Sequence, residues 1–174
     1  TKLKTPEGML TRPTTDRVKE ALFNIIQARI PGSQVLDAFA GTGNLGLEAW
    51  SRGAERIVYF DKSRESLKLV RANVEKARAG EAVTLIHTDA VNGLAMMEQQ
   101  GKQFDVIFSD PPYDKGLNQK VVEALEKWPV LKPGGLLVLE HSLGEDPGSY
   151  LPEGTEFRQE KYGDTKISLI VRKS

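Results

Sequence analysis

Short apolar segments alternate with amphipathic, helix-forming segments along most of this chain, and this alternation limits the possible folds more than any other feature. The apolar segments predicted as strands are residues 35–38, 57–60, 83–86, 104–108 and 136–140. The segments predicted as helices between them are residues 45–51, 63–77, 90–99 and 117–128. Strands that alternate with helices form a parallel sheet with helices on both of its faces. The sequence therefore predicts an α/β fold.

The carboxyl-terminal part departs from this alternation. Residues 157–161 and 166–171 have strand character, and only the short segment Tyr162-Gly163-Asp164-Thr165 separates the two. Two strands joined by so short a turn form an antiparallel hairpin. Added to the five parallel strands, the hairpin gives a Rossmann-like, seven-stranded and mostly parallel sheet.

The amino-terminal part also lies outside the alternation. An irregular lead is followed by a segment with a single apolar stripe, which predicts a helix that stops at Pro31-Gly32. We expect a single domain over residues 1–174, in which residues 1–30 form the lead and helix and residues 33–174 form the core.

Composition excludes several kinds of protein. The 174 residues contain no cysteine, which excludes disulfides, thiolate metal sites and a cysteine nucleophile. His87 and His141 have no partners at metal-ligand spacing, so no metal is expected. Neither a membrane-spanning segment nor a signal peptide is recognisable, and a cytoplasmic location is expected.

Charge is balanced overall, with 24 basic and 24 acidic side chains, but residues 1–29 carry six basic and three acidic groups. This local excess of positive charge suits contact with phosphates, and a solvated helix face explains it equally well.

A glycine-rich loop follows the first predicted strand. Gly41-Thr42-Gly43-Asn44-Leu45-Gly46 has the form G-x-G-x-x-G, and Asp61 ends the next strand 20 residues after Gly41 (61 − 41). At this spacing an acidic side chain binds the ribose hydroxyls of a nucleotide cofactor. NAD and S-adenosylmethionine both fit the pattern. Asp37, at the end of the first strand, favours S-adenosylmethionine, because a carboxylate attracts the ammonium of a methionine moiety and repels a pyrophosphate.

Two further strand ends carry polar groups. Asp89-Ala90 follows the third strand and is placed to contact an adenine edge. Asp110-Pro111-Pro112-Tyr113 follows the fourth strand, where open α/β sheets bind ligands. The two prolines stiffen the backbone and leave carbonyl groups unpaired. A carboxylate, a carbonyl and an aromatic ring within four residues suit a flat ring that bears an amine, which suggests chemistry on the exocyclic amine of a nucleobase.

These motifs resemble the class I S-adenosylmethionine-dependent methyltransferases that act on exocyclic amines. Further segments narrow the resemblance to the bacterial small-subunit rRNA guanine-N2 methyltransferases of the RsmD type, and it covers nearly the whole chain. The segments that carry it are residues 11–24 (TRPTTDRVKEALFN), 45–49 (LGLEA), 51–54 (SRGA) and 162–165 (YGDT). That family usually has a further basic, β-forming segment ahead of the first of these, which this sequence lacks, and the RNA-binding surface is expected to depend on it.

The resemblance implies a function and a set of site residues. A methyl group would pass from S-adenosylmethionine to the N2 of a guanine in 16S ribosomal RNA, on naked RNA or on an assembled particle, with the enzyme acting as a single subunit. The residues implied for the cofactor are Asp37, Ala38, Gly41, Thr42, Gly43, Asp61, Lys62, Asp89 and Ala90. Those implied for catalysis are Asp110, Pro111, Pro112 and Tyr113, and those for RNA are Arg12, Thr15, Arg17 and Tyr113.

By this resemblance, a flipped guanine would stack on Tyr113, and Asp110 and the Pro111 carbonyl would accept hydrogen bonds from its amino group. Three alternatives stay open: an adenine-N6 or other nucleic-acid amino methyltransferase, a non-catalytic cofactor-binding assembly factor, and, as the weakest, an NAD oxidoreductase.

Overall fold

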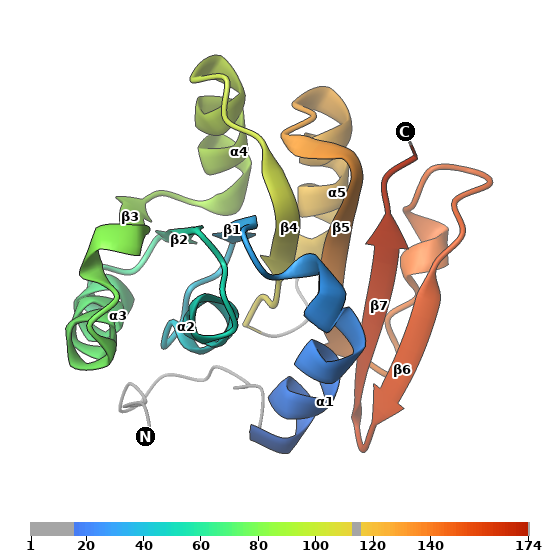
Figure 1. The fold of residues 1–174 in the computed structure, drawn as a ribbon. Helices are drawn as coiled ribbons and strands as arrows, with labels where there is room; N and C mark the ends of the chain where they lie inside the picture. Colours follow the sequence, from blue (N-terminus) through green and yellow to red (C-terminus); the bar gives the residue numbers. More distant parts are fainter. Residues whose placement is uncertain (1–15, 113–115, 174) are drawn as a thin grey trace.

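The computed structural model describes residues 16–112 and 116–173, which form a seven-stranded sheet with helices on both faces (Figure 1). Across the sheet the strands are ordered β3-β2-β1-β4-β5-β7-β6. Their bounds are β1 (Gln34–Asp37), β2 (Arg56–Asp61), β3 (Val83–His87), β4 (Phe104–Ser109), β5 (Leu131–Ser142), β6 (Arg158–Tyr162) and β7 (Thr165–Val171). Strands β1 to β5 pair in parallel, and β7 is antiparallel to both of its neighbours. The predicted Rossmann-like sheet with a terminal hairpin is confirmed.

Five α-helices occur among the described residues, and they divide between the two faces of the sheet. Their bounds are α1 (Asp16–Ile26), α2 (Asn44–Ser51), α3 (Arg64–Ala77), α4 (Ala90–Gln99) and α5 (Leu117–Lys127). Helices α1, α2 and α3 pack on one face and α4 and α5 on the other, so the core consists of two separate apolar clusters (Figure 1). None of the described helices is long and apolar enough to cross a membrane.

The side chains of the central strands alternate between these two clusters. In β4, Val106 and Phe108 contact the cluster under α1 to α3, whereas Ile107 contacts the cluster under α4 and α5. All three are fully buried, as expected for a parallel sheet covered on both faces. Strand β1 lies between β2 and β4, where the strand order reverses, and this is the place at which open α/β sheets bind ligands.

Strand β5 differs from its prediction. A turn was expected at residues 132–135 and a strand only over residues 136–140, but β5 begins at Leu131. The pairing with β4 passes from Phe104–Leu131 directly to Val106–Leu136, so the turn-forming residues bulge out of that ladder. On the other edge they pair with the end of β7, where the Gly134 N–H donates to the Arg172 carbonyl at 2.7 Å. Pairing with the end of β7 therefore keeps the turn-forming residues of β5 within the sheet.

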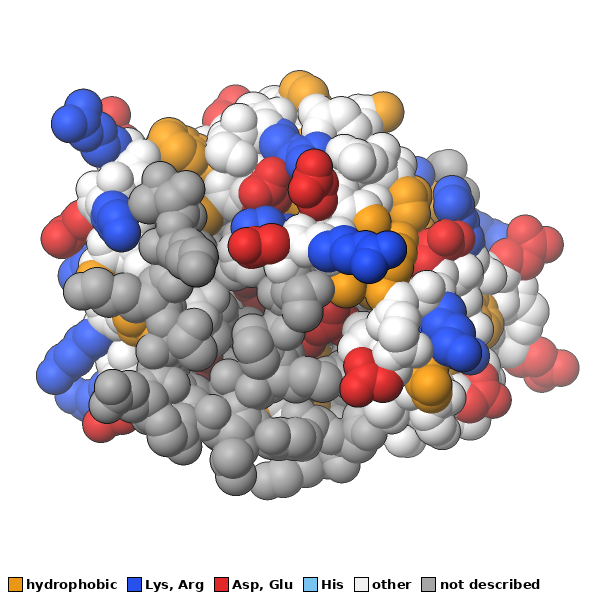
Figure 2. Space-filling model, turned by 90° about the horizontal axis from the view of Figure 1, so that it is seen from below, with side chains coloured by type: hydrophobic (Ala, Val, Ile, Leu, Met, Phe, Trp, Pro, Cys, Tyr) orange, Lys and Arg blue, Asp and Glu red, His pale blue; other side chains and the backbone are white. Residues whose placement is uncertain are grey.

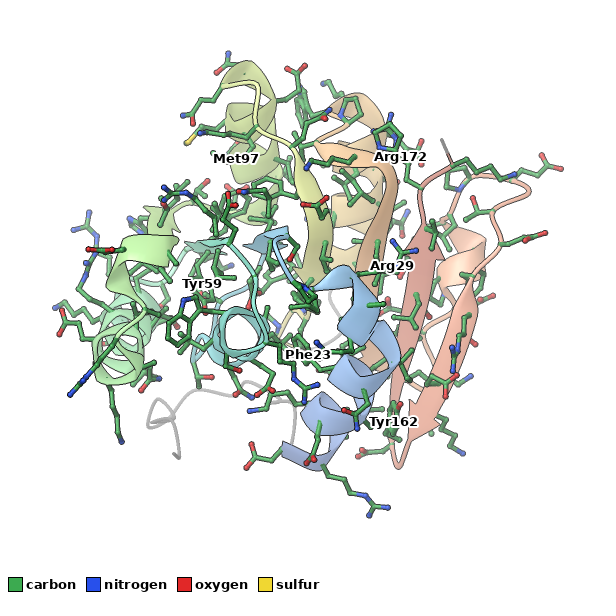
Figure 3. The ribbon with its side chains drawn as sticks, viewed as in Figure 1. Phe23, Arg29, Tyr59, Met97, Tyr162 and Arg172 are labelled. Carbon is green, nitrogen blue, oxygen red and sulfur yellow. The ribbon has the colours of Figure 1, made fainter. Side chains whose placement is uncertain are left out.

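Helix α1 is attached to α2 and to the sheet. The Lys19 Nζ donates to Asn44 Oδ1 at 2.8 Å and lies 3.5 Å from a Glu48 carboxylate oxygen. The Phe23 ring, labelled in Figure 3, is fully buried and packs against Phe108 at a centroid distance of 5.5 Å. The amino-terminal helix is therefore part of the same packed body as the core.

Candidate active site

A cavity of about 480 Å³ opens at the carboxyl ends of β1 to β4. Its size is within the range of about 300–1,000 Å³ typical of small-molecule sites. Four carboxylates from successive strand ends line it: Asp37, Asp61, Asp89 and Asp110. The parallel sheet thus brings together residues that are spread over more than 70 positions of the chain (110 − 37).

The glycine loop between β1 and α2 forms one wall of this cavity. Gly43 has a φ of +85°, which a residue with a side chain rarely adopts. Its carbonyl accepts a hydrogen bond from the buried Tyr59 hydroxyl at 2.7 Å. A Cβ added to Gly46 would lie 2.4 Å from that same hydroxyl, so the third glycine lets α2 pack directly against β2 (Figure 3 labels Tyr59). The last two glycines of the motif therefore serve the packing of Tyr59.

A second buried side chain, on α3, holds the glycine loop in place. Asn73 is 1% exposed, and its Nδ2 donates to the Thr42 carbonyl at 2.9 Å. Sequence reasoning found neither Asn73 nor Tyr59. For Asn73 the only available signal was an amide on a helix whose neighbours on that face are apolar.

Asp61 connects the glycine loop to the start of α3. One carboxylate oxygen accepts from the Gly41 N–H at 3.1 Å and the other from the Ser63 N–H at 2.8 Å. Partial burial raises the pKa of Asp61 above its ordinary value, while these two N–H groups and the nearby Lys62 and His87 oppose the rise. A carboxylate has about four lone-pair positions, so each oxygen can accept one further hydrogen bond.

Asp37 lies deeper than Asp61, at the base of the cavity. Its residue is 1% exposed, and the Phe39 N–H donates to it at 3.3 Å. Burial raises the pKa of Asp37 from 3.8 to about 8, and the negative charge of Asp61 adds to the rise. A cation bound beside Asp37 would reverse this shift by favouring the ionised carboxyl.

Asp89 and Ala90 form the side of the cavity at the start of α4. The Asp89 carboxylate accepts from the backbone N–H of Asn92 at 2.8 Å and from its side-chain amide at 2.7 Å, so it caps the helix. Its residue is nevertheless exposed at the cavity wall, and Ala90, although buried, also lines the cavity.

The segment after β4 forms the opposite wall. Asp110 and Pro112 are half-buried, Pro111 is buried, and all three line the cavity. Leu117, Lys120 and Val121 of α5 line the same wall. Sequence analysis predicted residues 117–128 only as a helix and gave Leu117 and Val121 no role in the site, although a helix that starts soon after Asp110-Pro111-Pro112-Tyr113 was a signal that it would face the same cavity.

The remaining predicted residues are placed as follows. Ala38, Gly41, Thr42 and Lys62 line the cavity, whereas Gly43 is buried behind the loop and does not. Arg17 is exposed on α1 and is not part of the cavity wall. Arg12, Thr15 and Tyr113 lie outside the described residues.

Neither histidine belongs to a cluster of metal-ligating side chains among the described residues. The His87 Nε2 lies 2.9 Å from the Lys62 carbonyl, and the His141 Nε2 lies 2.7 Å from the Ser168 hydroxyl. Trp50 packs against one of the two apolar clusters and Trp128 against the other.

Charges of both signs are mixed on the described part of the face shown in Figure 2. Blue lysine and arginine side chains alternate there with red carboxylates, and no broad area of one sign is present among the coloured residues (Figure 2). A phosphate backbone would therefore meet separate cations on this part of the surface.

Comparisons with known proteins agree with this geometry. Residues 1–171 match the model of the family described as conserved hypothetical protein 95. The putative rRNA methyltransferase YlbH of Bacillus subtilis is 31% identical over 98% of this chain and 93% of its own length. The ribosomal RNA small subunit methyltransferase D of Escherichia coli is 34% identical over 99% of this chain and 85% of its own length.

A solved structure gives the same result for the fold. The putative methyltransferase yhhF from Escherichia coli superposes with a TM-score of 0.83 at 32% identity. The match covers 98% of this chain and 91% of that one.

Proposed function

This chain belongs to the family described as conserved hypothetical protein 95, and from its similarity to rRNA methyltransferases and the residues of its cavity we propose that it methylates the exocyclic N2 of a guanine in small-subunit (16S) ribosomal RNA, with S-adenosylmethionine as methyl donor. One observation carries the proposal beyond the family: Asp110, Pro111 and Pro112 line the same cavity as Asp37 and Asp61. The segment that suits an amine therefore lies in the same cavity as Asp37 and Asp61, the two carboxylates that suit a nucleoside cofactor.

The cavity residues fit S-adenosylmethionine. Asp37 suits the ammonium of the methionine part, because a buried carboxylate gains most from an adjacent cation. Asp61 suits the ribose, because each of its oxygens retains acceptor capacity. Asp89 and Ala90 suit the adenine, and the apolar side chains of Ala38 and Val91 suit its faces. When bound, this cofactor supplies a methyl group on a positively charged sulfur.

The acceptor residues act by orientation and charge. The Asp110 carboxylate and the Pro111 carbonyl would each accept a hydrogen bond from the guanine amine, which turns the nitrogen lone pair towards the cofactor side of the cavity. Positive charge develops on that nitrogen during transfer, and a fixed carboxylate stabilises it. Reacting atoms held about 3–3.5 Å apart gain much of their acceleration from this placement.

The stiffness of the two prolines supports this role. Pro111 and Pro112 fix their own φ angles and restrict the residue before each of them. The direction of the Pro111 carbonyl relative to the neighbouring residues is therefore restricted. Tyr113 is proposed as the stacking surface for the flipped base.

We assign contact with the RNA backbone to the amino-terminal block, with Arg12, Thr15 and Arg17 as the proposed residues. Arg17 is exposed on α1, whereas Lys19 on the same helix is held by Asn44 and Glu48. Arg17 is therefore the better placed of the two for a phosphate. The protein is proposed to act as a single subunit.

The test is a methylation assay with labelled S-adenosylmethionine on three substrates: small-subunit particles from cells that lack this gene, naked 16S RNA, and duplex DNA. Label is expected on the N2 of one guanine, in the particle or the RNA. Label on adenine N6 of DNA would favour the alternative amino methyltransferase. Binding of the cofactor without transfer to any of the three would favour a non-catalytic assembly factor.

A further inference from the structure

A chain of hydrogen-bonded side chains begins at the residue just before Asp110. The Ser109 hydroxyl donates to Asn118 Oδ1 at 2.6 Å, and the Asn118 Nδ2 donates to a Glu145 carboxylate oxygen at 3.2 Å. The Tyr150 hydroxyl donates to the same Glu145 oxygen at 2.6 Å. Four side chains from β4, α5 and the segment after β5 are thereby connected.

Asn118 is the centre of this network, and its contacts leave it one orientation. It is 2% exposed, Ser109 is fully buried, and the Asn118 Nδ2 also donates to the Glu140 carbonyl of β5 at 3.1 Å. The nitrogen of the amide faces two groups that can only accept, the Glu140 carbonyl and the Glu145 carboxylate, so a flipped amide would lose both of these bonds. Breaking such a buried network leaves polar groups without partners, which is costly.

The network brackets the proposed acceptor site without entering it. Ser109 and Asn118 stand on either side of residues 110–117, and their side chains join the two ends of that segment. Asp110, Pro111 and Leu117 line the cavity, whereas Ser109 and Asn118 do not. Asn118 can therefore affect the reaction only indirectly, through the positions of Asp110 and Pro111.

We propose that Asn118 is a positioning residue, which fixes the direction of Asp110 and the Pro111 carbonyl by locking the end of β4 to the first turn of α5. The proposal rests on the proposed function, since it assumes that these groups hold the acceptor amine. A misplacement of about 1 Å at such a site costs on the order of 10²-fold in rate. Because Asn118 lies away from the cavity, its loss is expected to reduce kcat and to spare cofactor affinity.

The first experiment compares Asn118→Leu with Gln119→Leu. Gln119 is the next residue of the same helical turn, but it is exposed and donates to Glu123 at 3.1 Å outside the network. For Asn118→Leu, kcat per folded molecule is expected to fall at least about tenfold, with the dissociation constant of S-adenosylmethionine within about threefold of wild type. Gln119→Leu should leave both values within about twofold of wild type.

Three further variants keep the proposal testable if Asn118→Leu fails to fold. Tyr150→Phe keeps the ring and removes one donor at the outer end of the network, and Glu145→Gln keeps an oxygen that can accept both bonds. Tyr150→Phe is expected to lower kcat by about two- to fivefold, and Glu145→Gln should keep more activity than Glu145→Ala.

Hydrogen exchange separates this proposal from the proposed function. In Asn118→Leu, the amides of Ser109, Asp110 and Leu117 should exchange faster than in Gln119→Leu, whether or not the protein methylates RNA. Wild-type protein that binds the cofactor but never methylates would defeat the proposed function alone. Unchanged exchange at these amides, or a folded Asn118→Leu with a kcat within about twofold of wild type, would overturn the positioning role.

Discussion

At the scale of single residues, Asp37, Asp61 and Asp110 share one cavity but differ in what holds them. Asp37 is almost fully buried, Asp61 is tied to two backbone N–H groups, and Asp110 follows the end of β4 at the opposite wall. These differences assign the three carboxylates to different parts of the proposed reaction. Each assignment predicts a separate effect of substitution.

Replacement of Asp110 by alanine should stop methyl transfer while leaving the cofactor bound. We expect the rate of transfer to fall by at least ~10²-fold, as for the loss of a positioned contact to developing charge. Single-turnover methylation measures the rate and calorimetry measures the cofactor affinity. A variant with near-normal turnover would remove Asp110 from the mechanism.

Replacement of Asp61 by alanine should weaken cofactor binding. The expected loss is roughly 1.5–3 kcal/mol, the range for hydrogen bonds to a charged group. Calorimetric titration with S-adenosylmethionine gives the value. Asp61→Asn is the matched control, because it keeps an acceptor for the Gly41 N–H and so separates loop support from ribose binding. An unchanged affinity in Asp61→Ala would contradict the ribose role.

The raised pKa of Asp37 predicts that cofactor affinity increases with pH. Below about 8 the free protein holds a proton on this carboxyl, and binding of an ammonium beside it would expel that proton. Affinity should therefore increase between pH 6 and 7.5, by at most about tenfold per pH unit, and level off near pH 8, where an α-amino group itself begins to lose its proton. Calorimetry in buffers of different ionisation enthalpy measures the proton release.

Asp37→Asn is the control for this pH dependence of cofactor affinity and should show none of it.

The raised pKa of Asp37 also makes the stability of the fold depend on pH, in the opposite direction. Because the folded pKa of about 8 exceeds the ordinary 3.8, the folded protein binds more protons than the unfolded chain between these values. The contribution of Asp37 to stability is then complete below about pH 4 and is lost as the pH rises through 8. Urea unfolding of wild type and Asp37→Asn at several pH values tests the sign.

At the scale of elements, the contact of α2 with β2 depends on a missing side chain. Gly46→Ala would place a Cβ 2.4 Å from the Tyr59 hydroxyl and 2.7 Å from Ile57 Cγ2, both of them buried atoms. Overpacking of this kind costs about 1–3 kcal/mol of unfolding free energy. Urea unfolding measures it, and Gly80→Ala, whose added Cβ would meet nothing within 4 Å, should change stability by no more than about 0.5 kcal/mol. Equal stability of the two variants would contradict the close packing.

Local patterns predicted most of the elements. Helix α4 was predicted over residues 90–99, as observed, and the helix predicted over residues 63–77 is α3, which Ser63 caps by accepting from the Ser66 N–H at 3.2 Å. These features depend on neighbouring residues alone. The start of β5 was missed because its turn-forming residues pair with Arg172, which no local pattern reveals.

For the candidate site, too, the sequence predicted the features that depend on local patterns and missed those that depend on distant residues. Its carboxylates stand directly after apolar strands, so their common edge of the sheet followed from the alternation. The side chains that support the site could not be predicted in this way. Asn73, which holds the glycine loop, is separated from Thr42 by 31 positions, and Asn118, which holds the end of β4, is separated from Glu145 by 27. The glycine motif was assigned to cofactor binding, but Gly43 and Gly46 also let the loop and α2 pack against Tyr59.

At the scale of the whole molecule, the cofactor should stabilise the entire fold. The cavity joins the carboxyl ends of β1 to β4 to α2 on one face of the sheet and to α4 and α5 on the other, so a ligand in it bridges both faces. At a concentration of 100 times its dissociation constant, a ligand adds about 2.7 kcal/mol of stability. For a chain of this size that corresponds to an increase in Tm of roughly 5–11 °C. Thermal unfolding with S-adenosylmethionine tests this, and a shift with NAD in its place would favour the oxidoreductase alternative.

The position of β7 between β5 and β6 has a consequence for the order in which the protein is made. A ribosome delivers β6 before β7, yet β6 pairs with no other strand than β7 among the described residues. Every strand that borders the cavity is already synthesised at that moment. The half of the sheet that borders the cavity can therefore assemble on the nascent chain. Until β7 is synthesised and inserts between β5 and β6, β6 has no strand to pair with and the outer edge of β5 stays unpaired.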